Sequence, residues 1–329
     1  MSELLEIENL TVDFVAGQRV AHAVRGVTLR LGAGRTTVVL GESGSGKSVT
    51  ARAVMGLLGG GARVGGAVRL GGESLLDLNE RAMRSRRGRD IGLVPQDPGG
   101  SLDPLRKVGA QVAEVLRAHG VLTSRAARRE RVMELLTLAG IRTPERVAKS
   151  YPHELSGGMR QRVVIAAAIA CGPRLLIADE PTTALDMTVQ AQILELFGSL
   201  QRELDMAILL VTHDVGVARL MASSVVVMYA GRVVEEGPGD RVLDRPAHPY
   251  TAALLGAQPH PGVPRGELVG LPGLPPSATT VTEGRCALVP RCAHAVAECS
   301  TTSPVLEPVT DGGSVACPVP WTADERRVG

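Results

Sequence analysis

The hydrophobic and polar positions along the chain form patterns that are typical of a mixed α/β protein. Residues 4–31 hold two alternating apolar segments separated by Gly17, and this alternation predicts antiparallel strands. Short apolar runs predict buried strands at 36–40, 91–94, 175–178, 207–211 and 225–229. Because helical patterns separate several of these runs, the sequence predicts a mostly parallel sheet covered by helices on both faces.

Two changes in this pattern predict how the chain is divided. A stretch at about 97–170 has apolar residues at helical spacing, which predicts an inserted helical subdomain. After Gly237 the chain becomes rich in proline and loses its periodicity, which is typical of a domain boundary. For 329 residues, two domains are expected. We therefore predict a main domain at 1–237 and a small irregular extension at 238–329.

Composition and charge exclude several classes of function. Aromatic residues make up 2% of the chain and the net charge is +2, so neither a stacking platform nor a basic surface for nucleic acid is expected. The longest run without polar residues, Val163–Gly172, is about half the length that a membrane-spanning helix needs. The acidic start does not resemble a secretory signal. We therefore expect a cytosolic protein that would have to dock onto partner subunits to serve a membrane.

A glycine-rich segment after the predicted strand at 36–40 carries the strongest signal for chemistry. It fits the pattern G-x-x-x-x-G-K-[ST] and leads into a predicted helix, which is the context that a phosphate loop requires. Backbone N–H groups in such a loop surround phosphate oxygens, while a lysine reaches the β and γ phosphates and a serine ligates Mg²⁺. The nucleotide-binding residues expected here are Gly41, Ser43, Gly44, Ser45, Gly46, Lys47, Ser48 and Val49.

Other polar residues follow the predicted buried strands. Asp179 and Glu180 end one strand, where a carboxylate can ligate Mg²⁺ and a second can polarise the attacking water. His213 follows another strand at the same expected sheet edge, within reach of the γ-phosphate, although a lone histidine there is more often structural. Gln96 follows the strand at 91–94 and is ambiguous on its own.

The segment from Leu155 to Gln161, which contains Ser156, Gly157 and Gly158, resembles the signature motif of ABC-type ATPases. The order of the phosphate loop, Gln96, this segment, the two acids and His213 is also similar to that family's order. The resemblance covers residues 4–240 or so. It implies a P-loop NTPase core with an antiparallel β subdomain and an inserted helical subdomain.

The resemblance also implies roles for individual residues. Ser156, Gly157 and Gly158 would bind the γ-phosphate of ATP held by a second ATPase subunit, so that catalysis requires a head-to-tail dimer. Gln96 would sense the γ-phosphate and Mg²⁺, and Asp186 would communicate across the dimer. An aromatic residue near the N-terminus of such proteins stacks on adenine, and Phe14 stands at about that place, with a core phenylalanine as the alternative.

The extension resembles that of the ATPase subunits of dipeptide and oligopeptide importers, on the segments His248–Leu255 and Leu271–Ser277. That resemblance implies two transmembrane permease subunits, an extracytoplasmic solute-binding protein and a place at the cytoplasmic face of the cell membrane. Nickel importers belong to the same group, so the solute stays open. An exporter ATPase is disfavoured by the extension, and a soluble ABC-type switch is disfavoured by the lack of a second cassette in the chain.

Four of the five cysteines lie in the extension, at Cys286, Cys292, Cys299 and Cys317. In a reducing compartment, clustered cysteines more often bind metal than form disulfides. The segment Pro290-Arg291-Cys292 resembles a tail motif in which some members hold a [4Fe–4S] cluster, although the usual residues after the first cysteine are absent. Four thiolates suit either such a cluster or zinc, and the thiols could also stay unligated.

Overall fold

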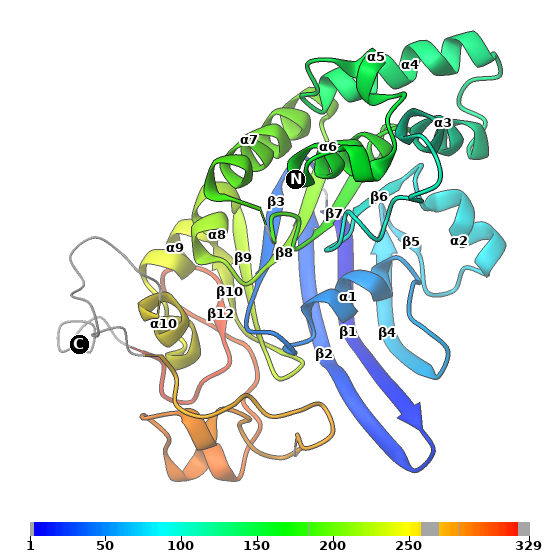
Figure 1. The fold of residues 1–329 in the computed structure, drawn as a ribbon. Helices are drawn as coiled ribbons and strands as arrows, with labels where there is room; N and C mark the ends of the chain where they lie inside the picture. Colours follow the sequence, from blue (N-terminus) through cyan, green and yellow to red (C-terminus); the bar gives the residue numbers. More distant parts are fainter. Residues whose placement is uncertain (1–2, 184, 258–269, 282, 322–329) are drawn as a thin grey trace. The chain divides into compact units, whose positions relative to one another are not determined.

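The computed structural model describes residues 3–183, 185–257, 270–281 and 283–321 (Figure 1). Contacts among its residues divide the chain into two compact units. The first consists mainly of Asp77–Leu210. The second combines Leu5–Arg30 and Thr36–Leu76 with the chain from Val211 onward. The extension after residue 237 therefore packs in the same unit as the glycine-rich loop.

An antiparallel sheet in the second unit confirms the strands predicted near the N-terminus. In the order β2-β1-β4-β5, it consists of β2 (Arg19–Gly32), β1 (Glu3–Ala16), β4 (Ala62–Leu70) and β5 (Glu73–Ser74). Leu5 and Ile7 are buried on β1, but the next buried positions are Leu10 and Val12, so the alternation slips by one residue. The pairing with β4 is irregular at the same place, and Asn9 has a positive φ of 48°. The apolar spacing along β1 thus encodes a β-bulge.

The partner strand β4 was not predicted because two adjacent glycines interrupt its apolar pattern. Gly66 has a φ of 89°, and a Cβ atom there would collide with the carbonyl oxygens of Glu8 and Asn9. A glycine is therefore required where β4 passes the bulge of β1.

A second sheet in this unit has the order β11-β12-β10-β9-β3. Its strands are β3 (Thr36–Leu40), β9 (Ser224–Tyr229), β10 (Arg232–Pro238), β11 (Glu307–Pro308) and β12 (Ser314–Val315). The predicted strands β3 and β9 pair in parallel, whereas β10 and β12 are antiparallel additions. The extension is thus less irregular than expected, because part of it extends this sheet. Its two strands are only two residues long, which is too short for an alternating pattern to reveal them.

Helices of the second unit are α1 (Lys47–Val54), α8 (Val215–Met221), α9 (Gly239–Asp244) and α10 (Pro249–Gly256). Two short 3₁₀ helices follow at Val289–Arg291 and Ala297–Ser300. Most of the extension between these elements has no regular secondary structure. Outside these helices and the two short strands, the described part of the extension is irregular, as expected.

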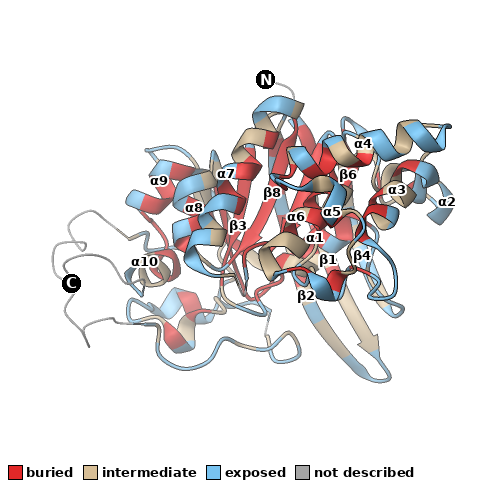
Figure 2. Cartoon of the chain, turned by 45° about the horizontal axis from the view of Figure 1, so that its top comes forward, coloured by how far each residue is buried: buried red, intermediate tan, exposed pale blue. Residues whose placement is uncertain are grey.

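In the first unit, the strands β6 (Ile91–Val94), β7 (Leu175–Asp179) and β8 (Ala207–Thr212) lie in the order β8-β7-β6. β6 and β7 pair in parallel, with Ile91 opposite Leu175. Every residue of β7 and β8 is buried, and Figure 2 shows β8 in red, the colour of buried residues. Continuous apolar runs of this kind are typical of parallel strands covered on both faces.

The helices of the first unit are α2 (Glu80–Arg86), α3 (Val108–Ala118), α4 (Arg125–Leu138), α5 (Pro144–Val147), α6 (Gly157–Ala168) and α7 (Met187–Leu204). A 3₁₀ helix lies at Pro152–Glu154. The helices α3, α4 and α6 pack against one another, which confirms the helical insertion. Among the described residues, no helix is both long and apolar enough to cross a membrane. The cores are filled mainly by Val, Leu, Ile and Ala, with Phe197 and Tyr250 as fully buried aromatics.

A buried carboxylate joins the extension to the second sheet. Glu235 on β10 is fully buried and accepts hydrogen bonds from the guanidinium of Arg241 and from the backbone N–H groups of Ala247 (2.7 Å) and His248 (3.0 Å). Its two oxygens thus satisfy a buried cation and the start of the segment that leads into α10. Removing it would leave the buried guanidinium of Arg241 unpaired.

We expect Glu235→Ala to lower the free energy of unfolding by about 3–5 kcal/mol. Asp244→Ala is the matched control, because Asp244 and its partner Arg219 form an exposed ion pair. That control should cost less than about 1 kcal/mol. Urea denaturation of both variants, followed by circular dichroism, measures the difference. Equal losses in the two variants would contradict the anchoring role of Glu235.

Candidate functional site

The glycine-rich loop connects the buried strand β3 to helix α1, as its motif predicted. Gly46 precedes α1 with a φ of 101°, and no side chain caps the helix start. The N–H groups in the first turn of α1 therefore point toward an anion site at the positive end of the helix dipole. Gly41 and Gly46 both lack space for a side chain. A Cβ atom on Gly46 would lie 2.6 Å from the carbonyl oxygen of Ala23.

The lysine of the loop is buried and turned back onto the loop itself. Lys47 Nζ donates hydrogen bonds to the carbonyl oxygens of Gly41 (2.7 Å) and Glu42 (2.8 Å). Ser45 is also buried, and among the described residues its Oγ has no hydrogen-bond partner. A buried hydroxyl without a partner, in the same loop as a buried ammonium group, fits a loop that binds phosphate oxygens.

The other residues predicted for this half of the site belong to the same unit. Ser43 and Gly44 are exposed at the tip of the loop, while Ser48 and Val49 are half-buried in the first turn of α1. Phe14 is half-buried near the end of β1, opposite Ala62 on β4. His213 is exposed and lies between β8 and the start of α8, where Asp214 caps the helix.

The first unit brings two of the predicted catalytic residues into direct contact. Gln96 follows β6 and Glu180 follows β7, and these strands are parallel neighbours. Gln96 Nε2 donates to Glu180 Oε2 (3.2 Å), and Thr183 Oγ1 donates to the same oxygen (3.0 Å). Thr183 is not among the residues that the motifs predicted, although its spacing of three residues from Glu180 places it on the same turn.

The backbone at the end of β7 is unusual. Asp179 is buried, whereas Glu180 is half-buried and has a φ of 48°, in the left-handed region that a glutamate seldom occupies. Such conformations persist where the surrounding structure imposes them, and they concentrate at functional sites. This turn directs the two neighbouring carboxylates into different surroundings, one interior and one partly open to solvent.

The predicted signature segment starts helix α6. Ser156 caps the helix, and its Oγ accepts a hydrogen bond from the backbone N–H of Met159 (3.3 Å). A Cβ atom on Gly158 would lie 2.6 Å from Val189 Cγ1, so the glycine allows the starts of α6 and α7 to approach. Gly157 is half-buried beside Leu185, with 3.7 Å from its Cβ position to Leu185 Cδ2. The positive dipole ends of two helices thus lie close to each other.

Asp186 has a local structural role in this unit. It caps α7, where its Oδ1 accepts a hydrogen bond from the backbone N–H of Val189 (3.0 Å). Its side chain is exposed. The function across a dimer that the resemblance implied stays a prediction.

The four cysteines of the extension line one small cavity together with His248 and His294. No disulfide joins them. Burial raises the pKa of Cys286, Cys292 and Cys317, the last to about 11, so these groups are neutral thiols at pH 7. Within the part of the chain that the structure describes, no three His, Cys, Asp or Glu side chains are arranged to hold a metal ion. The predicted iron–sulfur cluster therefore has no support from this arrangement, apart from the shared cavity.

Comparison with protein families finds two matches along the chain. The model described as "ABC transporter" matches residues 24–183, which include the phosphate loop, the signature segment and both acids. The model described as "Oligopeptide/dipeptide transporter, C-terminal region" matches residues 234–299. Three of the four cysteines in the extension fall within that second match.

Relatives match nearly the whole chain. This chain is 43% identical to the dipeptide transport ATP-binding protein DppD of Bacillus subtilis, and the match covers 99% of this chain and 96% of DppD. It is 44% identical to the oligopeptide transport ATP-binding protein OppD of Salmonella typhimurium, covering 95% and 93%. It is 47% identical to OppD of Mycobacterium tuberculosis over 96% of this chain, but spans only 52% of that relative's length.

A solved structure matches the fold. The ATP-binding cassette MJ0796, in a dimeric post-hydrolysis state bound to ADP and Pi, has a TM-score of 0.65 and 31% sequence identity. The match covers 71% of this chain and 98% of that one. The fold is thus that of an ABC ATPase.

Two of the three loop glycines offer a test of the phosphate-loop geometry. Gly44 has a φ of 80° and open space around it, whereas Gly46 has a φ of 101° and a close carbonyl. Gly44→Ala should cost about 1 kcal/mol from the backbone alone. Gly46→Ala should cost about 1–3 kcal/mol more, because Ala23 must move. Thermal unfolding measures both, and a Gly46→Ala variant no less stable than Gly44→Ala would contradict the geometry described.

Proposed function

We propose that this chain, which belongs to the ABC transporter family, is the ATP-hydrolysing subunit of an importer for peptides. The observation that carries the proposal is the combination of both family matches in one chain. The first covers an ATP-binding cassette, and the second covers a C-terminal region named for oligopeptide and dipeptide transporters. The full-length similarity to DppD and OppD supports the same solute class.

The proposed chemistry is hydrolysis of the γ-phosphate of ATP. Lys47 would bind the β and γ phosphates, while Ser48, Gln96 and Asp179 would hold Mg²⁺, which neutralises phosphate charge when bound. Glu180 would polarise the attacking water. Gln96 and Thr183 would orient the Glu180 carboxylate through their hydrogen bonds to it. His213 would contact the γ-phosphate, and Phe14 would stack on adenine. The hydrogen bonds on Glu180 support an orienting role for its neighbours.

The chain would work as one of two ATPase subunits, because the signature residues Ser156, Gly157 and Gly158 would complete the site of the other subunit. Asp186 would communicate between the subunits. Two transmembrane permeases would receive the motion at the cytoplasmic face of the membrane, and a solute-binding protein would deliver the peptide outside. In this scheme residues 1–237 form the ATPase domain, with its helical subdomain at 97–170 or so, and residues 238–329 form the extension.

Glu180→Gln tests the proposed hydrolysis. The amide cannot accept a proton from water, so we expect ATP to bind while its turnover falls by a factor of about 100 or more. Glu195→Gln is the matched control, because it changes an exposed carboxylate on α7 of the same unit. Phosphate release and retained nucleotide are measured on the assembled transporter. Phosphate release at the unchanged rate would remove Glu180 from the role of base.

We also propose that Cys286, Cys292, Cys299 and Cys317 hold a [4Fe–4S] cluster. What supports the proposal is that all four line one small cavity and that four cysteine sulfurs are the donor set such a cluster takes. Burial raises the pKa of Cys286 and Cys317, and these thiols would lose their protons on binding iron. The cluster would supply cross-linking of the extension; no step of ATP hydrolysis depends on it.

Purification without oxygen tests the cluster. We expect about four iron and four sulfide per chain and visible absorbance from thiolate-to-iron charge transfer. Cys299→Ser should lower the iron content, whereas Cys171→Ser, which changes the cysteine outside the extension, should not. A colourless and iron-free protein prepared in this way would refute the cluster.

A further inference from the structure

The second residue of the phosphate loop is held by a side chain from the extension. Arg291 donates to both carboxylate oxygens of Glu42, from Nη1 to Oε2 (2.8 Å) and from Nη2 to Oε1 (3.1 Å). The Arg291 side chain is 6% exposed and that of Glu42 is 28% exposed. A two-pronged pair of this kind, largely shielded from water, fixes direction as well as distance.

The backbone of Glu42 is held as well. Its N–H donates to the phenol oxygen of Tyr250 on α10 (2.8 Å), and Tyr250 is fully buried. Burial raises the pKa of Tyr250, so this hydroxyl stays neutral. The carbonyl oxygen of Glu42 accepts hydrogen bonds from Lys47 Nζ (2.8 Å) and from the backbone N–H of Ser45 (3.2 Å). Glu42 therefore connects the extension directly to the lysine of the phosphate loop.

Arg291 is itself fixed before it reaches Glu42. Its Nε donates to the carbonyl oxygen of Pro272 (2.8 Å), and its guanidinium lies 5.8 Å from the ring centre of Tyr229. The rings of Tyr229 and Tyr250 are 4.6 Å apart between centres. The Arg291 side chain therefore has little rotamer freedom left to lose when it pairs with Glu42, and it acts as a preorganised support for Glu42.

We infer that Arg291 and Tyr250 are positioning residues for the phosphates of ATP, which makes the extension part of the nucleotide site. They hold Glu42 at the point where the loop turns, and the carbonyl oxygen of Glu42 in turn accepts a hydrogen bond from Lys47, so the two residues fix the position from which Lys47 would reach the phosphates. This inference rests on the proposed function, because it assigns a role in binding ATP. In the phosphate-loop pattern, Glu42 occupies a position at which any residue is allowed, so the pattern assigns it no role.

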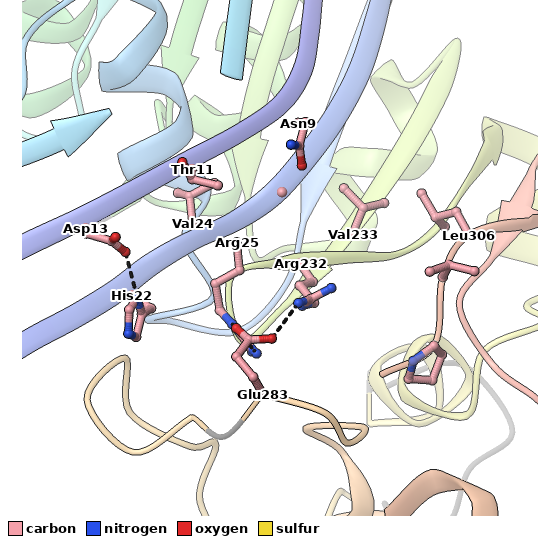
Figure 3. A pocket seen from close by; sticks show the side chains of 13 residues that line it. Asn9, Thr11, Asp13, His22, Val24, Arg25, Arg232, Val233, Glu283 and Leu306 are labelled. Atoms are coloured by element: carbon pink, nitrogen blue, oxygen red, sulfur yellow. Dashed lines mark hydrogen bonds and ion pairs between the residues drawn. The ribbon is translucent and has the colours of Figure 1, made fainter. Parts of the chain in front are cut away.

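A simpler role for Arg291 would be to attach the extension to the rest of the unit. A second ion-pair cluster already does so. Glu283 accepts hydrogen bonds from Arg25 (2.8 Å from Nη2, 3.0 Å from Nε) and from Arg232 (2.8 Å), at the edge of a polar pocket of about 570 Å³ (Figure 3). Within the described residues, these two arginines direct their hydrogen bonds to Glu283 and to the carbonyl oxygen of Ala230 rather than to Glu42. A substitution at Glu283 therefore tests attachment of the extension, whereas a substitution at Arg291 tests positioning of the phosphate loop.

The test is the ATP dependence of hydrolysis by the assembled transporter. We expect Arg291→Gln to raise KM for ATP by about tenfold with kcat within about threefold, because the support acts on the bound phosphates before the reaction. Glu42→Gln should raise KM for ATP to the same extent. The double variant should have no higher KM than either single variant, because both substitutions remove the same ion pair between Arg291 and Glu42. Glu283→Gln is the control and should lower the melting temperature while leaving KM unchanged.

Two further variants guard against a folding defect. Arg291→Lys keeps the charge but cannot form the two-pronged pair, so KM should lie between those of the wild type and Arg291→Gln. Tyr250→Phe removes only the acceptor for the Glu42 N–H and should also raise KM. A KM within about twofold of the wild type in folded Arg291→Gln and Tyr250→Phe would overturn the inference. A wild-type transporter that does not hydrolyse ATP would instead refute the proposed function.

Discussion

The glycine-rich loop between β3 and α1 imposes the constraint around which the second unit is built. Its N–H groups must converge while its lysine stays buried. Lys47 meets this requirement by donating to the carbonyl oxygens of Gly41 and Glu42, which ties the end of the loop to its beginning. The close contacts at Gly41 and Gly46 leave no space for side chains there. The β9–β10 hairpin supports the loop further, since Gly231 donates its N–H to the carbonyl oxygen of Ser45 (3.0 Å).

The first unit presents the other half of the chemistry in a similar way, through local geometry. The left-handed turn at Glu180 separates its carboxylate from the buried Asp179. Gln96 and Thr183 then fix that carboxylate from two sides. The starts of α6 and α7 lie together because Gly158 has no side chain. Both units thus hold polar groups in place through contacts within the chain, which lowers the entropic cost of binding.

The sequence predicted the parts of the fold that depend on local patterns. The strands β3, β6, β7, β8 and β9 were each expected within a residue or two of their observed bounds. The glycine-rich loop also lies between a buried strand and a helix, as its motif predicted. Periodicity could find these elements because each is long enough to repeat it.

The remainder depends on contacts that no local pattern records. The two glycines of β4 interrupt its apolar pattern, and Gly66 is needed because β4 passes the bulge of β1 there. The strands of the extension are too short to show alternation. The contact between Glu42 and Arg291 joins residues 249 positions apart, so neither residue signals the other. Arg291 also directly precedes Cys292, which places the thiol cavity next to the support of the phosphate loop in the chain.

The most direct measurement of the proposed function is peptide uptake by vesicles that contain the complete transporter with its binding protein. We predict that labelled di- or oligopeptide accumulates only with MgATP on the side that this chain faces, and that peptide-loaded binding protein stimulates ATP hydrolysis. Hydrolysis that peptide leaves unchanged, with no ATP-dependent accumulation of any peptide, would contradict it.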